Sequence, residues 1–450
     1  MLRFLRASAM ALVLAGSATA AAAEIRLTLP EARGTAARFL MEGRPDAALM
    51  LAEGVLLGAP GDVEALLLKS RALRDLGRTD EAGSAARAAL NSSTTAREEY
   101  FAALAMAQAK SSGRQGLVAQ YWLRRAADVA PDDHLRATAI NDFRLVRRIT
   151  PARLRLNLSV NPSDNLNDAP RGEVMYWGPF VNQLARPLSG VETRAQVDYS
   201  YRIALSENAR ITLGALYQMQ RVSLSGDARA TDPTAKNRDF AVDVLGVSAG
   251  YERRAADSRW LATAQLSQMR VLLAGDPLSD ITRLDLSYGR ALGETLTGTV
   301  SLGFERETRL DQSLPDADSR DIGLSLSRSG AHGVVKLSVA ATDVMSASPV
   351  TAREETRAAL SYHLAQPVLA LRPSLTVSYE ETRFDRAWLP IWLDERRDAE
   401  WQVAVDATIP GWSFRGFAPE IGVSFRDRSS NYVPYESRGA KLKLGLKSVF

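Results

Sequence analysis

The chain has 450 residues, of which 46% are hydrophobic and 24% charged, a balance that excludes wholesale disorder and allows two or three domains. It contains no cysteine, which excludes disulfides, thiolate metal sites, cysteine nucleophiles and lipid attachment at an N-terminal cysteine. The formal net charge is +4, but residues 151–450 contain 36 Lys and Arg against 36 Asp and Glu, so no nucleic acid is expected as a partner.

The first 23 residues have the order of a secretory signal peptide. Arg3 and Arg6 precede the apolar run from Ala9 to Ala15, and the small residues that follow, Ala18-Thr19-Ala20 and Ala21-Ala22-Ala23, suit signal peptidase. The run is too short for a membrane-spanning helix, and no later stretch has about 18 consecutive apolar residues. We therefore expect an exported protein, and any membrane crossing must use strands.

Residues 24–150 are predicted to form helical repeats. The stretch Gly43-Arg44-Pro45-Asp46-Ala47-Ala48 recurs as Gly77-Arg78-Thr79-Asp80-Glu81-Ala82, a spacing of 34 residues that is typical of tetratricopeptide repeats. A third, drifted unit runs from Ala96 to Val129 with its turn at Gly113-Arg114, and a closing helix is expected after it. The alternative is an unrelated bundle of helical hairpins. Stacked repeats present a concave peptide-binding surface, so this domain is expected to recognise a partner.

From Pro151 onward the sequence alternates apolar and polar residues, as strands with one lipid-facing and one wet face do. Short and long connections alternate between these runs, an asymmetry typical of outer-membrane barrels, and the shortest long connection is expected at Ala274 to Asp280. We predict an antiparallel transmembrane β-barrel of about 14 strands over residues 151–450. The predicted strands are Arg153 to Asn161, Val191 to Leu205, Arg210 to Val222, Asp239 to Arg253, Arg259 to Leu273, Ile281 to Arg290, Thr295 to Arg306, Arg320 to Arg328, Gly333 to Thr342, Glu354 to Leu364, Leu371 to Glu381, Arg397 to Thr408, Arg415 to Asp427 and Arg438 to Phe450.

The last predicted strand shows this alternation clearly. One face carries Leu442, Leu444, Leu446 and the terminal Phe450, and the other carries Lys441, Lys443 and Lys447. We expect the apolar face to meet outer-membrane lipid and, with Phe450, to serve as the signal for insertion by the barrel assembly machinery, while the lysines face a wet lumen. The alternative is an ordinary sheet edge in a soluble protein.

No constellation of residues points to catalysis or metal binding. His134, His332 and His363 fall in a predicted helix, turn and strand, without the spacing of a metal pair or of a general base. The sequence has no phosphate-binding glycine loop and no nucleophile elbow. We expect neither enzyme activity nor a cofactor.

A polar cluster, Asn161-Pro162-Ser163-Asp164-Asn165-Leu166-Asn167-Asp168, follows the first predicted strand. Such residues favour turns, so one interpretation is a structural corner. The other is that the cluster shapes the long link to Gly190, which is long enough to enter the lumen or to contact cargo. The candidate residues of this region are Asn161, Asp164, Asn165, Asn167 and Trp177.

An exported chain with tetratricopeptide-like repeats, a barrel of about 14 strands and a terminal Phe resembles the surface lipoprotein assembly modifier family, and Leu154 to Asp168 looks like the start of that family's barrel domain. The resemblance implies a Gram-negative outer-membrane protein with periplasmic repeats that delivers a cargo protein, either a surface lipoprotein or a secreted haem- or metal-binding protein, to the cell surface. The alternatives are a polysaccharide exporter and a solute porin with a periplasmic scaffold domain. Mixed inward charges, such as Arg283 with Asp285, count against the exporter.

Overall fold

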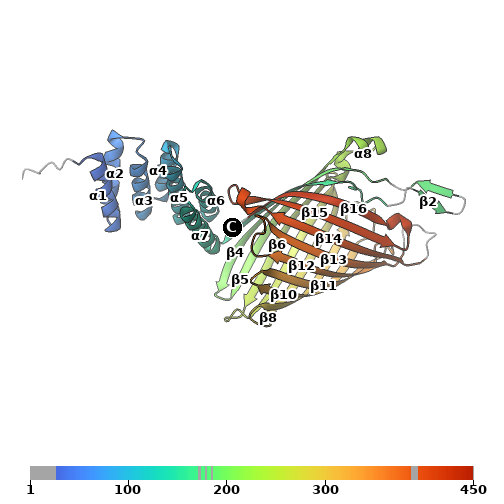
Figure 1. Ribbon diagram of the computed structural model, residues 1–450. Coiled ribbons are helices and arrows are strands. Elements are labelled where there is room, and N and C mark those ends of the chain that lie inside the picture. The colour runs from blue at the N-terminus through green and yellow to red at the C-terminus, as the bar shows by residue number, and fades with distance from the viewer. Residues whose placement is uncertain (1–26, 171–173, 178–179, 184–185, 387–393, 449–450) are drawn as a thin grey trace, which may run out of the picture. The chain divides into compact units, whose positions relative to one another are not determined.

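The computed structural model describes residues 27–450 except 171–173, 178–179, 184–185, 387–393 and 449–450 (Figure 1). The chain divides into two compact units, Met1–Ser92 and Ser93–Phe450. The predicted signal peptide and the terminal Phe450 lie outside the described residues. No helix in the described part of the chain is both long and apolar enough to span a membrane.

The first unit consists of α1 (Leu29–Met41), α2 (Pro45–Gly58), α3 (Val63–Asp75) and α4 (Thr79–Ser92). The α1–α2 and α3–α4 turns have the same geometry, because Gly43 and Gly77 have φ of 71° and 78°, a left-handed conformation that glycine adopts without strain. The same backbone bond closes both turns, from Arg44 N to Phe39 O and from Arg78 N to Leu73 O, each 2.8 Å long. The predicted pair of repeats is therefore confirmed in this unit.

The second unit begins with α5 (Ala96–Ser112), α6 (Gly116–Val129) and α7 (Asp133–Ile149). Buried Tyr100 packs against small residues of α6 and α7 and donates its hydroxyl to Leu135 O at 3.0 Å. In the α5–α6 turn Arg114, with φ of 58°, holds the left-handed position that Gly43 holds in the first repeat. The third unit therefore keeps the fold of the turn but has lost its glycine.

The rest of the second unit is a closed antiparallel barrel of fourteen strands, as predicted (Figure 1). Its strand order is β1-β16-β15-β14-β13-β12-β11-β10-β9-β8-β7-β6-β5-β4, so β1 closes the barrel against β16. The strands are β1 (Ala152–Ser163), β4 (Gly190–Ser206), β5 (Ala209–Leu224), β6 (Val242–Arg254), β7 (Trp260–Leu273), β8 (Asp276–Ala291), β9 (Leu296–Arg309), β10 (Ala317–Gly330), β11 (Gly333–Ser346), β12 (Arg353–Leu364), β13 (Arg372–Phe384), β14 (Arg396–Thr408), β15 (Phe417–Ser430) and β16 (Ser437–Ser448).

Side chains alternate between the two faces of this barrel. On β16 the outward-pointing Leu442, Leu444 and Leu446 are 38–46% exposed, as expected for the lipid face of the last strand. On β15 the alternate residue Glu420 is only 9% exposed and accepts hydrogen bonds from lysines of β16, so it points inward. An apolar outer surface around a polar interior is the arrangement that lipid requires of a transmembrane barrel.

The end of the barrel at which β1 begins and β16 ends is called the near end, and the opposite end is the far end. The far-end connections contain α8 (Gly226–Thr231) and the single-turn helices η1 (Asn237–Phe240) and η3 (Val433–Tyr435), and η2 (Pro410–Trp412) lies at the near end. A separate hairpin of β2 (Val174–Trp177) and β3 (Phe180–Gln183) lies within the link that the sequence presented as loop.

Several predicted strands stop or start a few residues away from the observed boundary, such as the strand expected to end at Thr342, since β11 runs to Ser346. Two further errors concern a connection and the start of a strand. The connection expected at Ala274 to Asp280 is a two-residue turn of Ala274 and Gly275, with φ of 55° and 95°, because β8 already begins at Asp276. The strand expected from Asp239 starts later, since residues up to Phe240 form η1. Both errors lie outside the apolar band of the barrel. Polar residues from Asp276 onward extend a strand, and polar residues before Val242 form a helical turn where a strand was expected. The alternation of apolar and polar residues does not mark either boundary.

Candidate functional site

Ion pairs line the interior of the barrel. Arg283 of β8 contacts three carboxylates, those of Asp285 at 2.8 Å, Glu305 at 3.2 Å and Asp321 at 2.7 Å. In the closed strand order β9 and β10, which carry Glu305 and Asp321, stand opposite β16 and β1. The predicted mixture of inward charges around Arg283 is confirmed, and it leaves this wall with an excess of negative charge.

The opposite wall carries the inward lysines of β16. Lys443 lies 2.6 Å from a carboxylate oxygen of Glu420 and 3.2 Å from Asp406, and Lys447 also contacts Glu420 at 3.2 Å. The cationic face expected for the last strand therefore faces the lumen. Paired charges of this kind keep an interior hydrated without giving it one sign.

The three candidate asparagines form hydrogen bonds at the end of β1 and in the loop after it. Asn161 is 9% exposed and donates its amide to Glu192 at 3.2 Å. Asn165 exchanges two hydrogen bonds with the backbone of Ala169, at 2.8 and 3.0 Å, and Asn167 accepts from Leu188 N at 2.9 Å. The contacts of Asn165 and Asn167 match the structural-corner interpretation of the cluster, because both satisfy main-chain groups of the loop, whereas Asn161 bonds to a side chain of β4.

The two acidic residues of the cluster reach other strands instead. Asp164 accepts a hydrogen bond from Ala440 N of β16 at 3.3 Å. Asp168 forms ion pairs with Arg426 and Arg428 of β15, the second at 2.8 Å. Both arginines alternate with the outward residue Phe425, so the loop turns to the inner side of the barrel. We define the far clasp as the contacts of Asp164 and Asp168 with β16 and β15.

Asp168 was part of the polar cluster but not among the predicted site residues, because nothing near it in sequence signals its partners. Of the remaining candidates, Trp177 ends β2, where its backbone pairs with Phe180, away from the strands of the barrel.

At the near end a single arginine of α6 contacts the barrel. Arg124 donates to the carbonyls of Arg415 and Gly416 at 3.1 and 2.9 Å and to the Ser448 hydroxyl at 2.9 Å. Its guanidinium also lies 4.6 Å from the ring centre of Phe143 and 4.7 Å from that of Phe417. Burial, together with repulsion from Arg147, lowers the pKa of Arg124 to about 10, so it keeps its charge at neutral pH. We call these contacts the near clasp.

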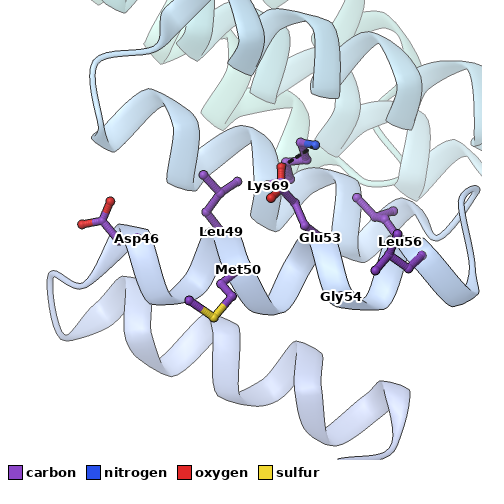
Figure 2. Close-up of a pocket in the computed structure, with 8 residues that line it drawn as sticks. Asp46, Leu49, Met50, Glu53, Gly54, Leu56 and Lys69 are labelled. Carbon is purple, nitrogen blue, oxygen red and sulfur yellow. Dashed lines mark ion pairs between the residues drawn. The ribbon is translucent and has the colours of Figure 1, made fainter.

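A groove of about 830 Å³ lies between α2 and α3 in the first unit (Figure 2). Met50 and Leu57 of α2 line it and are 73% and 88% exposed, which is unusual for large apolar side chains. Asp46 adds a carboxylate, and Glu53 pairs with Lys69 at 2.9 Å in the groove wall (Figure 2). Sequence analysis predicted a partner-binding surface on the repeats without assigning residues to it, and this groove was not among its candidates.

Among the described residues no group of His, Cys, Asp and Glu has a geometry suited to a metal ion. The acidic residues of the lumen are instead distributed among arginine and lysine partners.

No family model matches this chain, and no curated protein matches it. Among solved structures, the first tetratricopeptide domain of human RPAP3 is 15% identical and covers 27% of this chain and 90% of its own, with a TM-score of 0.24. OccAB3 from Acinetobacter baumannii is 10% identical and covers 66% of this chain and 99% of its own, with a TM-score of 0.37. A bacterial polysaccharide outer membrane secretin is 10% identical over 66% of this chain and 98% of its own, with a TM-score of 0.33. The description of this chain as an outer-membrane-type barrel with helical repeats therefore rests on its own strand order and outer surface.

Proposed function

We propose that this protein is an outer-membrane translocator that delivers an exported cargo protein to the cell surface. The observation that carries the proposal is the union, in one chain, of a barrel with a charged interior and helical repeats with an exposed apolar groove. In this proposal the near end and the helices lie in the periplasm and the far end lies outside. The protein would act as a conduit without catalysis or cofactor, so the direction of transport would come from folding or capture of cargo outside.

The groove suggests which part of the cargo binds. Met50 and Leu57 offer apolar surface, and Asp46 offers a carboxylate at its edge. Such a surface suits an extended or helical cargo segment with apolar side chains and a basic residue. The further partners would be the barrel assembly machinery, which would recognise the last strand and Phe450, and outer-membrane lipid.

A solute channel is the second candidate, because a lumen lined by paired charges of both signs also suits small hydrated ions. Carboxylates surround Arg283 on one wall, and Lys443 and Lys447 project from the other. A polysaccharide exporter is less well supported, since the ion pairs interrupt any row of one sign.

The test measures surface exposure of a candidate exported protein by antibody labelling of intact cells, with total cargo measured by blotting. The double variant Met50→Asp, Leu57→Asp is expected to reduce exposure at least about tenfold, since charges replace the apolar groove surface. Met41→Asp serves as the matched control, because Met41 is also 73% exposed but does not line the groove.

Deletion of the whole chain gives the reference for complete loss. Unchanged exposure of every candidate cargo in the deletion strain would refute translocation. Ion conductance in planar bilayers without any cargo effect would then favour the solute channel.

A further inference from the structure

The barrel closes through an incomplete ladder between β1 and β16. In the described part of these strands the pairs in register are Leu158 with Leu446, Ser159 with Gly445, Val160 with Leu444 and Ser163 with Lys441. On its other side the same strand pairs with β4 without a gap from Ala152 to Ser163. Pro162, which has no N–H to donate, lies in the interrupted part of the ladder. We call the β1–β16 contact the seam.

Side chains bridge this seam at the far end. The loop that carries Asp164 and Asp168 continues from β1, yet its ion pairs with Arg426 and Arg428 end on β15, one strand beyond β16. Leu166 N bonds to Leu188 O at 2.8 Å, and the Leu166 side chain packs against the apolar cluster around Leu188 and Leu224. The far clasp is therefore anchored on the β1 side and can hold β15 and β16 against it.

The near clasp also joins a segment on the β1 side of the seam to β15 and β16. Arg124 belongs to α6, which is joined through α7 to the first residue of β1, and its bonds end on Gly416 and Ser448 beside β15 and on β16. Gly416 has φ of 71° and Arg415 of 52°, an arrangement that presents two successive carbonyls to one guanidinium. Each end of the seam thus has charge-assisted side-chain bonds, while the middle has a short backbone ladder.

We propose that the seam is a lateral exit of the barrel, kept closed by the near and far clasps. The inference rests on the proposed function and deepens it. It names the route, which runs from the lumen sideways into lipid, and it names apolar cargo segments as those that take this route. An apolar segment gains nothing from a lumen lined by ion pairs, whereas the outer edge of the seam lies among lipid-facing residues such as Leu158 and Leu446. Opening requires the loss of few backbone bonds, because the described residues of the seam form few.

The test measures the width of the seam in the purified full-length chain in lipid nanodiscs. Spin labels on Leu158→Cys and Leu446→Cys report the seam, and the absence of native cysteine makes labelling specific. Labels on Leu158→Cys and Ala195→Cys report the complete β1–β4 contact as the matched pair. Pulsed electron resonance then gives the distance distribution of each pair.

Asp168→Asn removes the carboxylate of the far clasp that pairs with Arg426 and Arg428. It is expected to raise the ratio of long to short distances across the seam at least about tenfold, the effect of weakening charge-assisted hydrogen bonds to two arginines, while the β1–β4 pair keeps a single narrow distance. Asp311→Asn is the control, because Asp311 pairs with Arg309 in another far-end loop. Heat-modified gel mobility verifies folding of each variant.

An unchanged seam distribution in Asp168→Asn, or equal broadening of both pairs, would overturn the proposal. Since no cargo is present, this result would leave the translocator function itself untouched. Conversely, an opening seam in a chain that affects no cargo would refute the proposed function alone.

Discussion

The two sides of β1 differ in how they are held. Towards β4 the strand pairs over its full length, whereas with the described residues of β16 it pairs over a short and interrupted stretch. On the β16 side, contacts of Asp168 and Arg124 join segments flanking β1 to the strands across the seam. Backbone ladders are formed or lost cooperatively, while single side-chain bonds can be broken one at a time. The difference indicates that one contact in the barrel is built to be stable and its neighbour to be adjustable.

The largest effect is expected from charges placed on the two strands that flank β1, and it tests whether β16 and β4 face lipid alike. Leu444→Arg at the seam and Val197→Arg on β4 should each cost about 2–4 kcal/mol of folding stability, since both place a charge on the lipid face. Urea titrations in lipid vesicles, followed by gel mobility, would measure this cost. Ser424→Arg, which points into the lumen, is the control and should cost much less. A negligible cost for Leu444→Arg alone would mean that the seam is not lipid-facing.

The second prediction weakens the near end of the seam. Arg124→Ala should destabilise the docking of α6 on the barrel by about 1.5–3 kcal/mol, because two carbonyls and a hydroxyl lose a charged donor. Faster amide exchange in residues 409–416 and 445–448 would report it. Arg125→Ala is matched in position but pairs with Glu99 of α5, so those amides should exchange at the wild-type rate. Equal effects of both substitutions would contradict the near clasp.

A smaller effect is expected in the helices that carry the near clasp, which a substitution in the α5–α6 turn should stabilise. Arg114→Gly relieves a left-handed non-glycine residue in the α5–α6 turn and should stabilise α5–α7 by about 0.5–1 kcal/mol. Thermal unfolding of the purified chain, followed by amide exchange in α5 and α6, would detect this gain. The equivalent change in the opposite sense, Gly77→Arg, should destabilise the first unit, and a stable Gly77→Arg variant would refute the explanation.

The smallest effect depends on pH and concerns Asp142 on α7, next to the Phe143 ring of the near clasp. Burial raises the pKa of Asp142, so the folded state holds the carboxyl proton more tightly than the unfolded state does. Stability is therefore lost as pH rises through the range in which Asp142 titrates. Asp142→Asn should therefore stabilise α5–α7 by less than about 0.5 kcal/mol at pH 7 and by nothing at pH 3. Thermal midpoints at the two pH values would test this, and an equal gain at both would contradict it.

Most of the fold could be predicted from the sequence, because its two periodicities have direct physical causes. A period of two identified all fourteen barrel strands, and the repeated glycine turn identified the first two helical repeats. The errors occur where polar residues extend beyond the apolar band, as at Asp276, or where a short hairpin such as β2–β3 forms within a long link.

The candidate site could be predicted only in part. The polar cluster could be recognised from its composition, and Asn165 and Asn167 hold its loop as turn-forming residues do. The partners of Asp168 lie more than 250 residues away in the chain, at Arg426 and Arg428, and only barrel closure brings them together. The same applies to Arg124, whose acceptors are backbone carbonyls that carry no sequence signal.

The most direct test measures surface exposure of cargo in living cells whose seam is held closed by a crosslink. A short crosslinker joined through disulfide bonds to Leu158→Cys and Leu446→Cys should abolish surface exposure of cargo, and cleavage of those disulfides by a reductant should restore it. The same bridge between Leu158→Cys and Ala195→Cys should leave exposure unchanged, because the β1–β4 contact is already complete. Undiminished exposure with the seam locked would contradict the account.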